Sequence, residues 1–524
     1  MQLMPRPIFR PLLAVALAGL AAWGQPALAA QRQPQETKAV DWAAAAQTDI
    51  EAVYATLRDN HPGPPDPESR RFAAWLEEGR SIALSNARLA SSQADYWRAV
   101  RGYTNGFRDG HIWFGVSDAT FQWPGFLTRK DADGRTRVTI NSGALQVPLG
   151  AQLMGCDGSN ADALLQRLVN PYRWNADIPH ERDAASVFLF APLADDPLRP
   201  RKCQFTAQGR VVSHAMRWET ISPERLTDLL DKARGSARPT LGLQQVGEVW
   251  FVSLPTFQFE ADSATAMQAL LKKLRAQAKR LHAARWVVLD VRGNGGGNSA
   301  WGSDVAKALY GDAAVQRIEG QFDWTVDWRA SAQNAATLRF YASVAQKNGQ
   351  EEDARYRSKL AEALEQAAKK GEAYVRQTDE DTVAATAPPV ASPFQGRVFL
   401  LTDNVCASAC LDFADIARRL PGVVHVGLPT SADAVYIDNT GGELPSGQGN
   451  LSYSMKVYRH RVRANNEWYE PAVRWPGGAM TDAAVARWLK GLSVHAPRIG
   501  NSEDRKLNRG GRRTGPGPLP RAHR

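Results

Sequence analysis

The chain has 524 residues, of which 44% are hydrophobic, and a formal net charge of +10. This length accommodates about two to four domains, and the apolar fraction is ordinary for a globular protein with a buried core. Arg6 and Arg10 carry two of the positive charges and the tail 501–524 carries a net five, so about three remain for the rest of the chain. So small an excess gives no reason to predict binding to nucleic acid.

Residues 1–30 have the composition of a secretory signal peptide. Arg6 and Arg10 precede the apolar run Leu12–Ala22, and small residues at 27–29 form a cleavage site. The run is shorter than the ~20 residues of a membrane-spanning helix, and no later stretch is long and apolar enough to cross a bilayer. We therefore expect a soluble protein that is exported to the periplasm or secreted. Residues 493–524 are rich in Gly, Pro and Arg and are expected to form a disordered basic tail.

The sequence contains four cysteines, and an even number in an oxidising compartment permits disulfides. No Cys-x-x-Cys pair and no histidine spacing typical of a metal site occurs, so we predict no metal. Two of the cysteines bracket Ser408, either as a local disulfide or as two small buried thiols, and spacing alone leaves both open. The cysteines are Cys156, Cys203, Cys406 and Cys410.

Residues 41–116 are predicted to form an N-terminal helical cap. Apolar residues recur at helical spacing from Asp49 to Leu57, and two further amphipathic helices are expected over 71–90 and 93–103. The region ends in Asp109-Gly110-His111, just before an apolar strand. This places His111 at the end of an element, where its side chain can project into a cleft. The alternative is an ordinary structural histidine.

Residues 117–222 change to short strands separated by Asp-Gly and Gly-Ser turns. The segment Leu149–Gly158, followed by the helical pattern Ala161–Val169, resembles the core of a PDZ domain. Such a β-rich module binds extended peptides by adding them to the edge of a sheet. We therefore expect a PDZ-like, peptide-binding module here.

Residues 240–492 read as an α/β domain with a charged helical insertion at 329–376, which we interpret as a lid or a packing element. A buried strand, Trp286–Val291, ends in a cluster of glycines at 293–297. Glycines at the carboxyl end of a strand allow close approach of the backbone and expose N–H groups. The dinucleotide fingerprint is not met, because Asn298 stands where its third glycine is required, so no cofactor is predicted.

Ser408 is the candidate nucleophile. The apolar run Val398–Leu401 predicts a buried strand, and apolar residues from Leu411 onward keep helical spacing. Ser408 therefore lies at a strand-to-helix corner, where the first helical N–H groups and the helix dipole favour a developing negative charge. The alternative is that Ser408 is only a helix cap.

Five motifs occur in the order seen in the C-terminal-processing (tail-specific) serine peptidases, and their style is closest to the tricorn-like, histidine-using branch. The resemblance implies a helical cap, a PDZ-like module and a catalytic domain with the ClpP/crotonase-like α/β fold. It also implies that Ser408 is the nucleophile, that His111 is the general base, and that the N–H groups of Gly295, Gly296 and Ala409 bind the oxyanion. The motifs are Asp109-Gly110-His111, Asp290–Gly297, Ala407-Ser408-Ala409, Gly427-x-x-Thr430 and Tyr469-Glu470-Pro471.

Two positions depart from the pattern of this family. Lysine-dependent members carry a lysine where this chain has Asp433, so a Ser-Lys dyad is not expected. In the tricorn-like members a serine precedes the histidine, and here Gly110 takes its place. Glu467 lies near the position of that branch's acidic residue. The alternatives for the acid that orients His111 are Glu470, Asp433 and Asp438.

The sequence therefore predicts an exported serine endopeptidase that cleaves proteins or peptides near their C-termini, without metal or cofactor. A serine hydroxyl needs a base within hydrogen-bond reach, and histidine can both accept and return the proton. The alternative is a catalytically inactive relative that binds peptides or an apolar ligand in the same cleft. A crotonase-type enzyme acting on acyl-CoA rests on fold analogy alone.

Overall fold

The structure, a computed structural model, describes residues 40–131, 133–142, 147–235, 238–259, 261–377 and 391–495. The chain divides into two compact units, Met1–Met480 and Thr481–Arg524, and the described part of the second contains α13 (Asp482–His495). The predicted signal peptide and, beyond residue 495, the predicted basic tail lie outside the described residues. Of the helices in the described ranges, none is long and apolar enough to cross a membrane.

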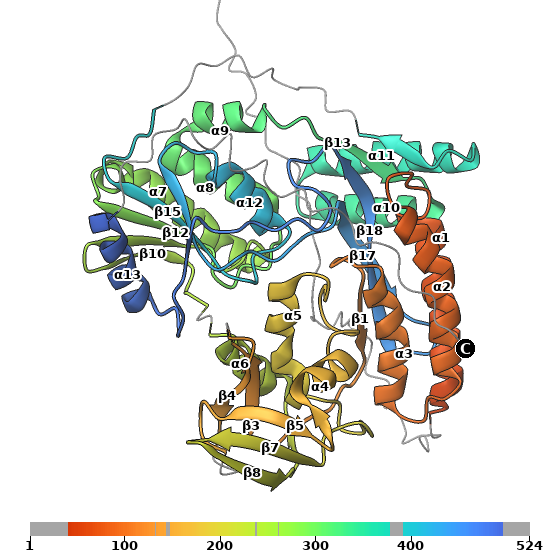
Figure 1. Cartoon of the computed structure of the whole chain (residues 1–524). Helices are drawn as coiled ribbons and strands as arrows, with labels where there is room; N and C mark the ends of the chain where they lie inside the picture. The colour runs from red at the N-terminus through yellow and green to blue at the C-terminus, as the bar shows by residue number, and fades with distance from the viewer. Residues whose placement is uncertain are drawn as a thin grey trace, which may run out of the picture. The chain divides into compact units, whose positions relative to one another are not determined.

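A six-stranded sheet, which we call the parallel sheet, forms the centre of the predicted α/β region (Figure 1). Neighbouring strands from β11 onward are parallel, and β10 pairs with β11 in the antiparallel sense. Every residue of β12 is buried, as expected for a strand covered on both faces. In sheet order the strands are β10 (Gly242–Val246), β11 (Val249–Ser253), β12 (Trp286–Asp290), β15 (Arg397–Thr402), β16 (Val423–Gly427) and β19 (Val473–Arg474).

Helices pack on the parallel sheet through apolar side chains at helical spacing. Leu274, Val305 and Phe413, from three different helices, share one core with Val287 and Leu400 of the sheet. This core fixes the helices that follow the two central strands. The helices are α7 (Ala261–His282), α8 (Ser299–Tyr310), α9 (Asp312–Glu319) and α12 (Ala409–Ala417).

A second sheet, which we call the antiparallel sheet, supports the helical cap. The long strand β18 pairs with β17 along one edge and with β1 and β13 along the other, and β14 pairs with β13. Tyr96 and Phe114 of the cap region lie in one core with Tyr453 of β18. The elements are α1 (Trp42–Asn60), α2 (Arg70–Ala87), α3 (Gln93–Gly106), β1 (Trp113–Val116), β13 (Thr325–Arg329), β14 (Tyr374–Arg376), β17 (Tyr436–Glu443) and β18 (Gly449–Arg459).

The predicted insertion 329–376 consists of α10 (Ala332–Lys347) and α11 (Glu351–Lys369), which pack against each other. Leu338, Leu360 and Leu364 of these helices belong to the same core as the cap helices. β13 and β14 flank the hairpin and join it to the antiparallel sheet. Of the two interpretations that the sequence allowed, the structure favours a packing element.

The predicted β-rich module has its own sheet and its own core. Leu226 and Leu230 of α6 also pack in this core, so the module continues past the expected boundary at 222. A disulfide joins Cys156 to Cys203, which are direct neighbours on β5 and β7. Its elements are β2 (Phe121–Trp123), β3 (Phe126–Lys130), β4 (Thr136–Asn141), β5 (Gln152–Cys156), β6 (Ser159–Asn160), α4 (Ala161–Leu168), α5 (Pro179–Ala185), the 3-10 helix η1 (Ser186–Phe190), β7 (Lys202–Ala207), β8 (Arg210–Ala215), β9 (Glu219–Ile221) and α6 (Pro223–Ala233). The described chain is thus mixed α/β, as predicted.

The Cys156–Cys203 disulfide is expected to stabilise the module rather than the chemistry of Ser408. It closes a loop with a sequence separation of 47. Replacing both cysteines by alanine should lower the free energy of unfolding by about 2–4 kcal/mol, because the unfolded chain regains the entropy that the crosslink removes. Chemical denaturation measures this change. Labelling of Ser408 by a fluorophosphonate probe should stay unchanged at 25 °C, and loss of labelling in a folded variant would contradict the assignment.

Candidate active site

Two loops meet at the carboxyl edge of the parallel sheet because the strands before them are neighbours. The glycine cluster follows β12, the Ser408 loop follows β15, and these strands pair in parallel. Asp403 joins the loops: its Oδ2 accepts a hydrogen bond from Gly293 N at 2.9 Å, and its Oδ1 accepts one from Val405 N at 3.0 Å. Asp403 is buried. The strand order and this one carboxylate therefore set the distance between the glycine cluster and Ser408.

Ser408 occupies a strained backbone conformation at the start of α12. Its φ of 52° and ψ of −124° are unfavourable for a residue with a side chain and cost about 1–3 kcal/mol. The side chain makes no capping hydrogen bond to the helix, which argues against the alternative that Ser408 is only a cap. Cys406 and Cys410 form a disulfide across this corner, and both are fully buried. The corner thus holds the hydroxyl away from its own helix.

Gly296 lies directly against Ser408. A Cβ at position 296 would be 2.8 Å from the Ser408 Cβ and 3.1 Å from the Ala409 N, so only glycine fits. The N–H of Gly296 donates to Asn294 Oδ1 at 2.9 Å. This contradicts the prediction that Gly296 offers a free oxyanion donor, since the Asn294 side chain occupies its N–H. Gly296 instead allows the glycine cluster to lie close to Ser408.

The N–H groups of Gly295 and Ala409 remain as donors. Within the described chain neither of them donates a hydrogen bond. Ala409 is the first residue of α12, and an N–H at that position has no partner inside the helix. Gly295 is exposed at the tip of the glycine cluster. These two amides suit an anion that forms beside the Ser408 hydroxyl.

The antiparallel sheet positions three further side chains near Ser408. His111 lies just before β1, Asp433 lies before β17, and Arg461 lies just after β18. Because β18 is antiparallel to both β1 and β17, the chain before each of those strands runs toward the end of β18: β17 begins opposite Val457, and β1 begins opposite Ser452. One end of this sheet therefore presents an imidazole, a carboxylate and a guanidinium together.

His111 faces Ser408 with one ring nitrogen and two carboxylates with the other. The Nε2 lies 3.5 Å from Ser408 Oγ, and the Nδ1 lies 3.5 Å from Asp433 Oδ1 and 3.6 Å from Asp109 Oδ1. The Nδ1 is buried and has no hydrogen-bond partner among the described residues. These contacts are at the loose end of the range expected before a substrate binds. Burial lowers the pKa of His111, but the charges of Asp433 and Asp109 outweigh burial and raise it above the usual value.

Asp109 and His61 form a second layer behind His111. Asp109 Oδ1 accepts from His111 N at 2.8 Å, and its Oδ2 lies 3.2 Å from His61 Nε2. Gly63 N donates to His61 Nδ1 at 2.9 Å, so the proton of a neutral His61 is on Nε2 and is donated to Asp109. Burial raises the pKa of Asp109, but the hydrogen bonds from His111 and His61 hold it well below its usual range. Burial lowers the pKa of His61, which keeps that ring neutral.

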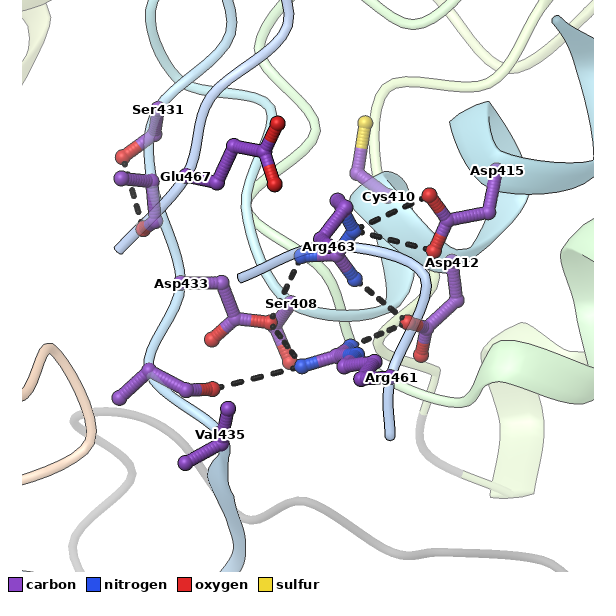
Figure 2. A network of polar contacts seen from close by, with 12 residues as sticks. Ser408, Cys410, Asp412, Asp415, Ser431, Asp433, Val435, Arg461, Arg463 and Glu467 are labelled. Carbon is purple, nitrogen blue, oxygen red and sulfur yellow. Dashed lines mark hydrogen bonds and ion pairs between the residues drawn. The ribbon is translucent and has the colours of Figure 1, made fainter. Parts of the chain in front are cut away.

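Asp433 is held by two arginines (Figure 2). Its Oδ2 accepts from Arg461 Nη1 at 3.1 Å and lies 3.6 Å from Arg463 Nη1, which leaves its Oδ1 toward His111. Arg461 also donates to Asp412 on α12. Because Asp109 Oδ1 is already bonded to the backbone, Asp433 Oδ1 is the oxygen better placed to accept from the His111 Nδ1–H. The structure therefore favours Asp433 as the acid.

The carboxylates of the other predicted acids contact groups other than His111. Glu467 is exposed, and its carboxylate accepts from Ala464 N in its own turn, so the preference for Glu467 is contradicted. Its backbone, however, bridges to that of Asp433. Glu470 pairs with Arg474, and Asp438 pairs with the buried Lys456 at 2.7 Å. The structure therefore favours Asp433 over the predicted Glu467, and the two residues lie on bridged backbone segments.

Sequence reasoning did not single out Asp109, His61 or Arg461 as members of the site. Asp109 carried a local signal, because an aspartate two residues before His111 can bond its backbone N–H and fix the turn. His61 and Arg461 carried none, since only the folded sheets bring them close. The assembled groups suit nucleophilic acyl transfer: a hydroxyl, an imidazole oriented by a carboxylate, and free backbone donors.

Comparison with known proteins places this geometry in context. Residues 248–461 match the profile of peptidase family S41. The crystal structure of mature CPAF is similar to the fold, with 13% identity, a TM-score of 0.57, and coverage of 86% of this chain and 96% of that chain. The structure of mature CPAF complexed with lactacystin is also similar, with 13% identity and a TM-score of 0.58. The match covers 86% of this chain and 97% of that chain. A search of the curated proteins finds no relative.

Gly296→Ala is expected to remove most reactivity of Ser408. The added methyl group would lie 2.8 Å from the Ser408 Cβ and 2.9 Å from the Ala407 O, so the corner must shift. A displacement of about 1 Å at a reacting group costs roughly 10²-fold in rate, and fluorophosphonate labelling kinetics measure it. Gly442→Ala is the matched control, because its Cβ meets nothing within 4 Å. Undiminished labelling of Gly296→Ala would show that the close approach does not matter.

Asp433→Asn is expected to change the pH dependence of the reaction. Asp433 raises the pKa of His111, so its neutralisation lets the imidazole lose its proton at lower pH. The acidic limb of the kcat/KM profile should therefore move to lower pH, while the plateau falls by about 10²- to 10⁴-fold because the imidazolium loses its partner. Glu467→Gln is the control and should keep both features. A normal profile for Asp433→Asn with a changed one for Glu467→Gln would restore the sequence-based choice.

Proposed function

We propose that the chain, of which residues 248–461 match the profile of peptidase family S41, is an exported endopeptidase that cleaves proteins or peptides near their C-termini through Ser408 and His111. The observation that carries this proposal is the convergence of two distant segments. His111 Nε2 lies 3.5 Å from Ser408 Oγ, although 297 residues separate them in sequence. The free N–H of Ala409 adjoins the same hydroxyl.

In the first half of the reaction, Ser408 Oγ attacks the carbonyl carbon of the scissile peptide bond while His111 Nε2 takes the hydroxyl proton. The carbonyl oxygen becomes an oxyanion, and the amides of Ala409 and Gly295 are the donors that stabilise it, each worth roughly 3–4 kcal/mol in sites of this kind. His111 then gives the proton to the leaving amine, and the acyl group stays on Ser408. In the second half, a water molecule attacks the acyl-enzyme with the same base.

Asp433 assists by fixing the tautomer of His111 and by stabilising the imidazolium that forms in both halves. Its Oδ1 faces the Nδ1, and the arginine that holds its Oδ2 prevents the carboxylate from turning away. Asp109 adds a second negative charge on the same side of the ring, at 3.6 Å. Both negative charges stabilise the protonated form of His111. They therefore favour transfer of the hydroxyl proton from Ser408 to His111.

The proposed domain roles follow from the resemblance. The central domain is proposed to have the ClpP/crotonase-like fold, and the β-rich module is proposed to be PDZ-like. Its sheet ends in β8, an edge strand on which Val211 and Val212 are exposed. An extended segment of the substrate can add to such an edge through main-chain hydrogen bonds, with side chains supplying selectivity. Presentation of an unfolded C-terminal region to Ser408 would follow from this.

Export is proposed from the first residues and from the cysteines. The positively charged start, the apolar run and the small residues at 27–29 fit a cleaved signal peptide. Two disulfides within one chain fit an oxidising compartment, because cytosolic thiols are kept reduced. Fractionation of expressing cells, with detection of a mature N-terminus near residue 30, tests this part separately from catalysis.

Ser408→Ala is expected to abolish both fluorophosphonate labelling and hydrolysis of an unfolded protein substrate, because no other group in the site can form the acyl-enzyme. Its Tm should change little, since the hydroxyl supports no helix cap. Ser81→Ala, at an exposed position in α2, is the matched control and should label normally. Mass spectrometry of the fragments reports the cleavage sites. Equal labelling of wild type and Ser408→Ala would exclude Ser408, and cleavage scattered along the substrate would exclude the C-terminal preference.

A further inference from the structure

The disulfide between Cys406 and Cys410 encloses the nucleophile but takes no part in the proposed reaction. It joins residues four apart in sequence, with Ser408 midway between them. Cys406 lies in the loop that follows β15, and Cys410 belongs to the first turn of α12, so the bond ties the loop to the helix. Both cysteines are fully buried, whereas Ala407 and Ser408 are only half-buried. The corner is therefore fixed at its two ends and has room to move in the middle.

Hydrogen bonds do not support the middle of this corner. Within the described chain the three backbone amides of 407–409 donate no hydrogen bond. The amides of Cys406 and Cys410 on either side do donate, to Asp403 O at 3.2 Å and to Ala407 O at 3.0 Å. Among the residues that the structure describes, the disulfide is thus the bond that joins both ends of this unsupported stretch.

The unsupported stretch contains the strained residue. Ser408 has a φ of 52° and a ψ of −124°, a region that residues with a side chain avoid. A serine just before a helix has a favourable alternative, in which φ is negative and the hydroxyl accepts a hydrogen bond from the first helical turn. In that alternative Ser408 is an ordinary cap, and its hydroxyl turns away from His111 toward its own helix. The reactive conformation therefore requires a constraint, and the disulfide, whose Cα atoms lie 5.3 Å apart across the corner, is placed to supply it.

We propose that the Cys406–Cys410 disulfide keeps Ser408 in its reactive conformation, so that the chain with both thiols reduced is a latent, slowly reacting form of the enzyme. This inference rests on the proposed function, since it concerns the nucleophile assigned there. The two cysteines are positioning residues, because they act through Ser408 and not on the substrate. A chain that folds in a reducing compartment carries two thiols and stays latent, and it becomes active in an oxidising one.

The activating step is a thiol–disulfide exchange. The thiolate of one cysteine attacks a disulfide of the oxidant and releases one thiol, and the second cysteine then attacks the mixed disulfide and releases the other. The enzyme loses two electrons and two protons, and the oxidant, a low-molecular-weight or protein disulfide, becomes two thiols. The other two cysteines of the chain are joined as Cys156–Cys203, so no third thiol of the chain competes. Because Cys406 and Cys410 are buried, an external thiol reaches the finished bond only when the corner opens.

The size of the effect follows from the strain at Ser408. If the disulfide offsets the cost of that conformation, its loss lowers the population of the reactive form by about 5- to 150-fold. The rate of fluorophosphonate labelling and kcat should fall by this factor. KM should stay the same, because the cap and the β-rich module keep their own cores. The reduced corner also stays packed, since a free cysteine is a small apolar side chain.

The test uses the Cys156→Ala/Cys203→Ala variant, in which Cys406–Cys410 is the remaining disulfide. One sample is kept in dithiothreitol and the other in oxidised glutathione, and titration of free thiols identifies the state of each. The reduced sample should label more slowly, keep its native circular dichroism, and recover its rate after transfer to oxidised glutathione. Equal labelling rates of the two states overturn the proposal. A loss of labelling that occurs only with unfolding overturns it as well, because the disulfide would then be merely structural.

Cys406→Ala/Cys410→Ala decides the question where dithiothreitol does not reach the buried bond. This variant should label about 5- to 150-fold more slowly than wild type at a temperature where both are folded, and oxidised glutathione should not restore the rate. Cys156→Ala/Cys203→Ala is the matched control, because it removes the other disulfide of the chain, and it should label at the wild-type rate. Wild-type labelling by Cys406→Ala/Cys410→Ala overturns the proposal. If that variant does not fold, Cys406→Ala replaces it, since it breaks the same bond with a smaller loss of volume.

Failure of this inference is distinguishable from failure of the proposed function. A chain that labels and cleaves peptides equally well in both redox states remains a peptidase and has no latent form. A chain whose Ser408 reacts in neither state, although thiol titration shows that the disulfide is formed, loses the proposed function and this inference with it.

Discussion

A buried set of ion pairs joins the two sheets that carry the reacting groups (Figure 2). Asp412 lies one turn after Ser408 on α12 and accepts hydrogen bonds from Ser299 at 2.7 Å, from Arg461 and from Arg463. Ser299 begins α8, directly after the glycine cluster, and Arg461 follows the end of β18. Since Arg461 also holds Asp433, one network fixes the Ser408 loop, the glycine cluster and Asp433 relative to one another.

The value of this network is geometric rather than energetic. Burying charges costs as much as or more than their mutual attraction returns, so apolar side chains of the same volume would stabilise the fold equally well. Arg461 and Arg463 outweigh burial at Asp412 and hold its pKa below the usual value. At Asp415 burial prevails and raises the pKa, and Tyr469 donates its hydroxyl hydrogen bond there. Hydrogen bonds are directional, so these ion pairs fix the position of Asp433 relative to Ser408. A packed apolar core would define that position less precisely.

The sequence was sufficient where local patterns decide the structure. Ser408 and the glycine cluster each follow a short apolar run that became a central strand, and parallel pairing of β12 with β15 made them neighbours. Order along the chain also indicated His111. The acid was not predictable, because Glu467 and Asp433 lie on adjacent backbone segments and only side-chain direction separates them. The contact of His61 with Asp109 could not be predicted either, because 48 residues separate the two and the contact depends on packing of the cap.

The carboxylate at position 433 is consistent with His111, and not a lysine, as the base proposed for Ser408. In the lysine-dependent relatives that this chain resembles, a lysine stands at this position. Here a cation at 433 would meet the guanidinium groups of Arg461 and Arg463, which lie 3.1 and 3.6 Å from the carboxylate that occupies the place. Three neighbouring cations that share only Asp412 and Asp415 are less stable than a carboxylate between two of them. The arginines and Asp433 therefore form one unit with His111: the carboxylate that the arginines require is also the group that raises the pKa of the imidazole.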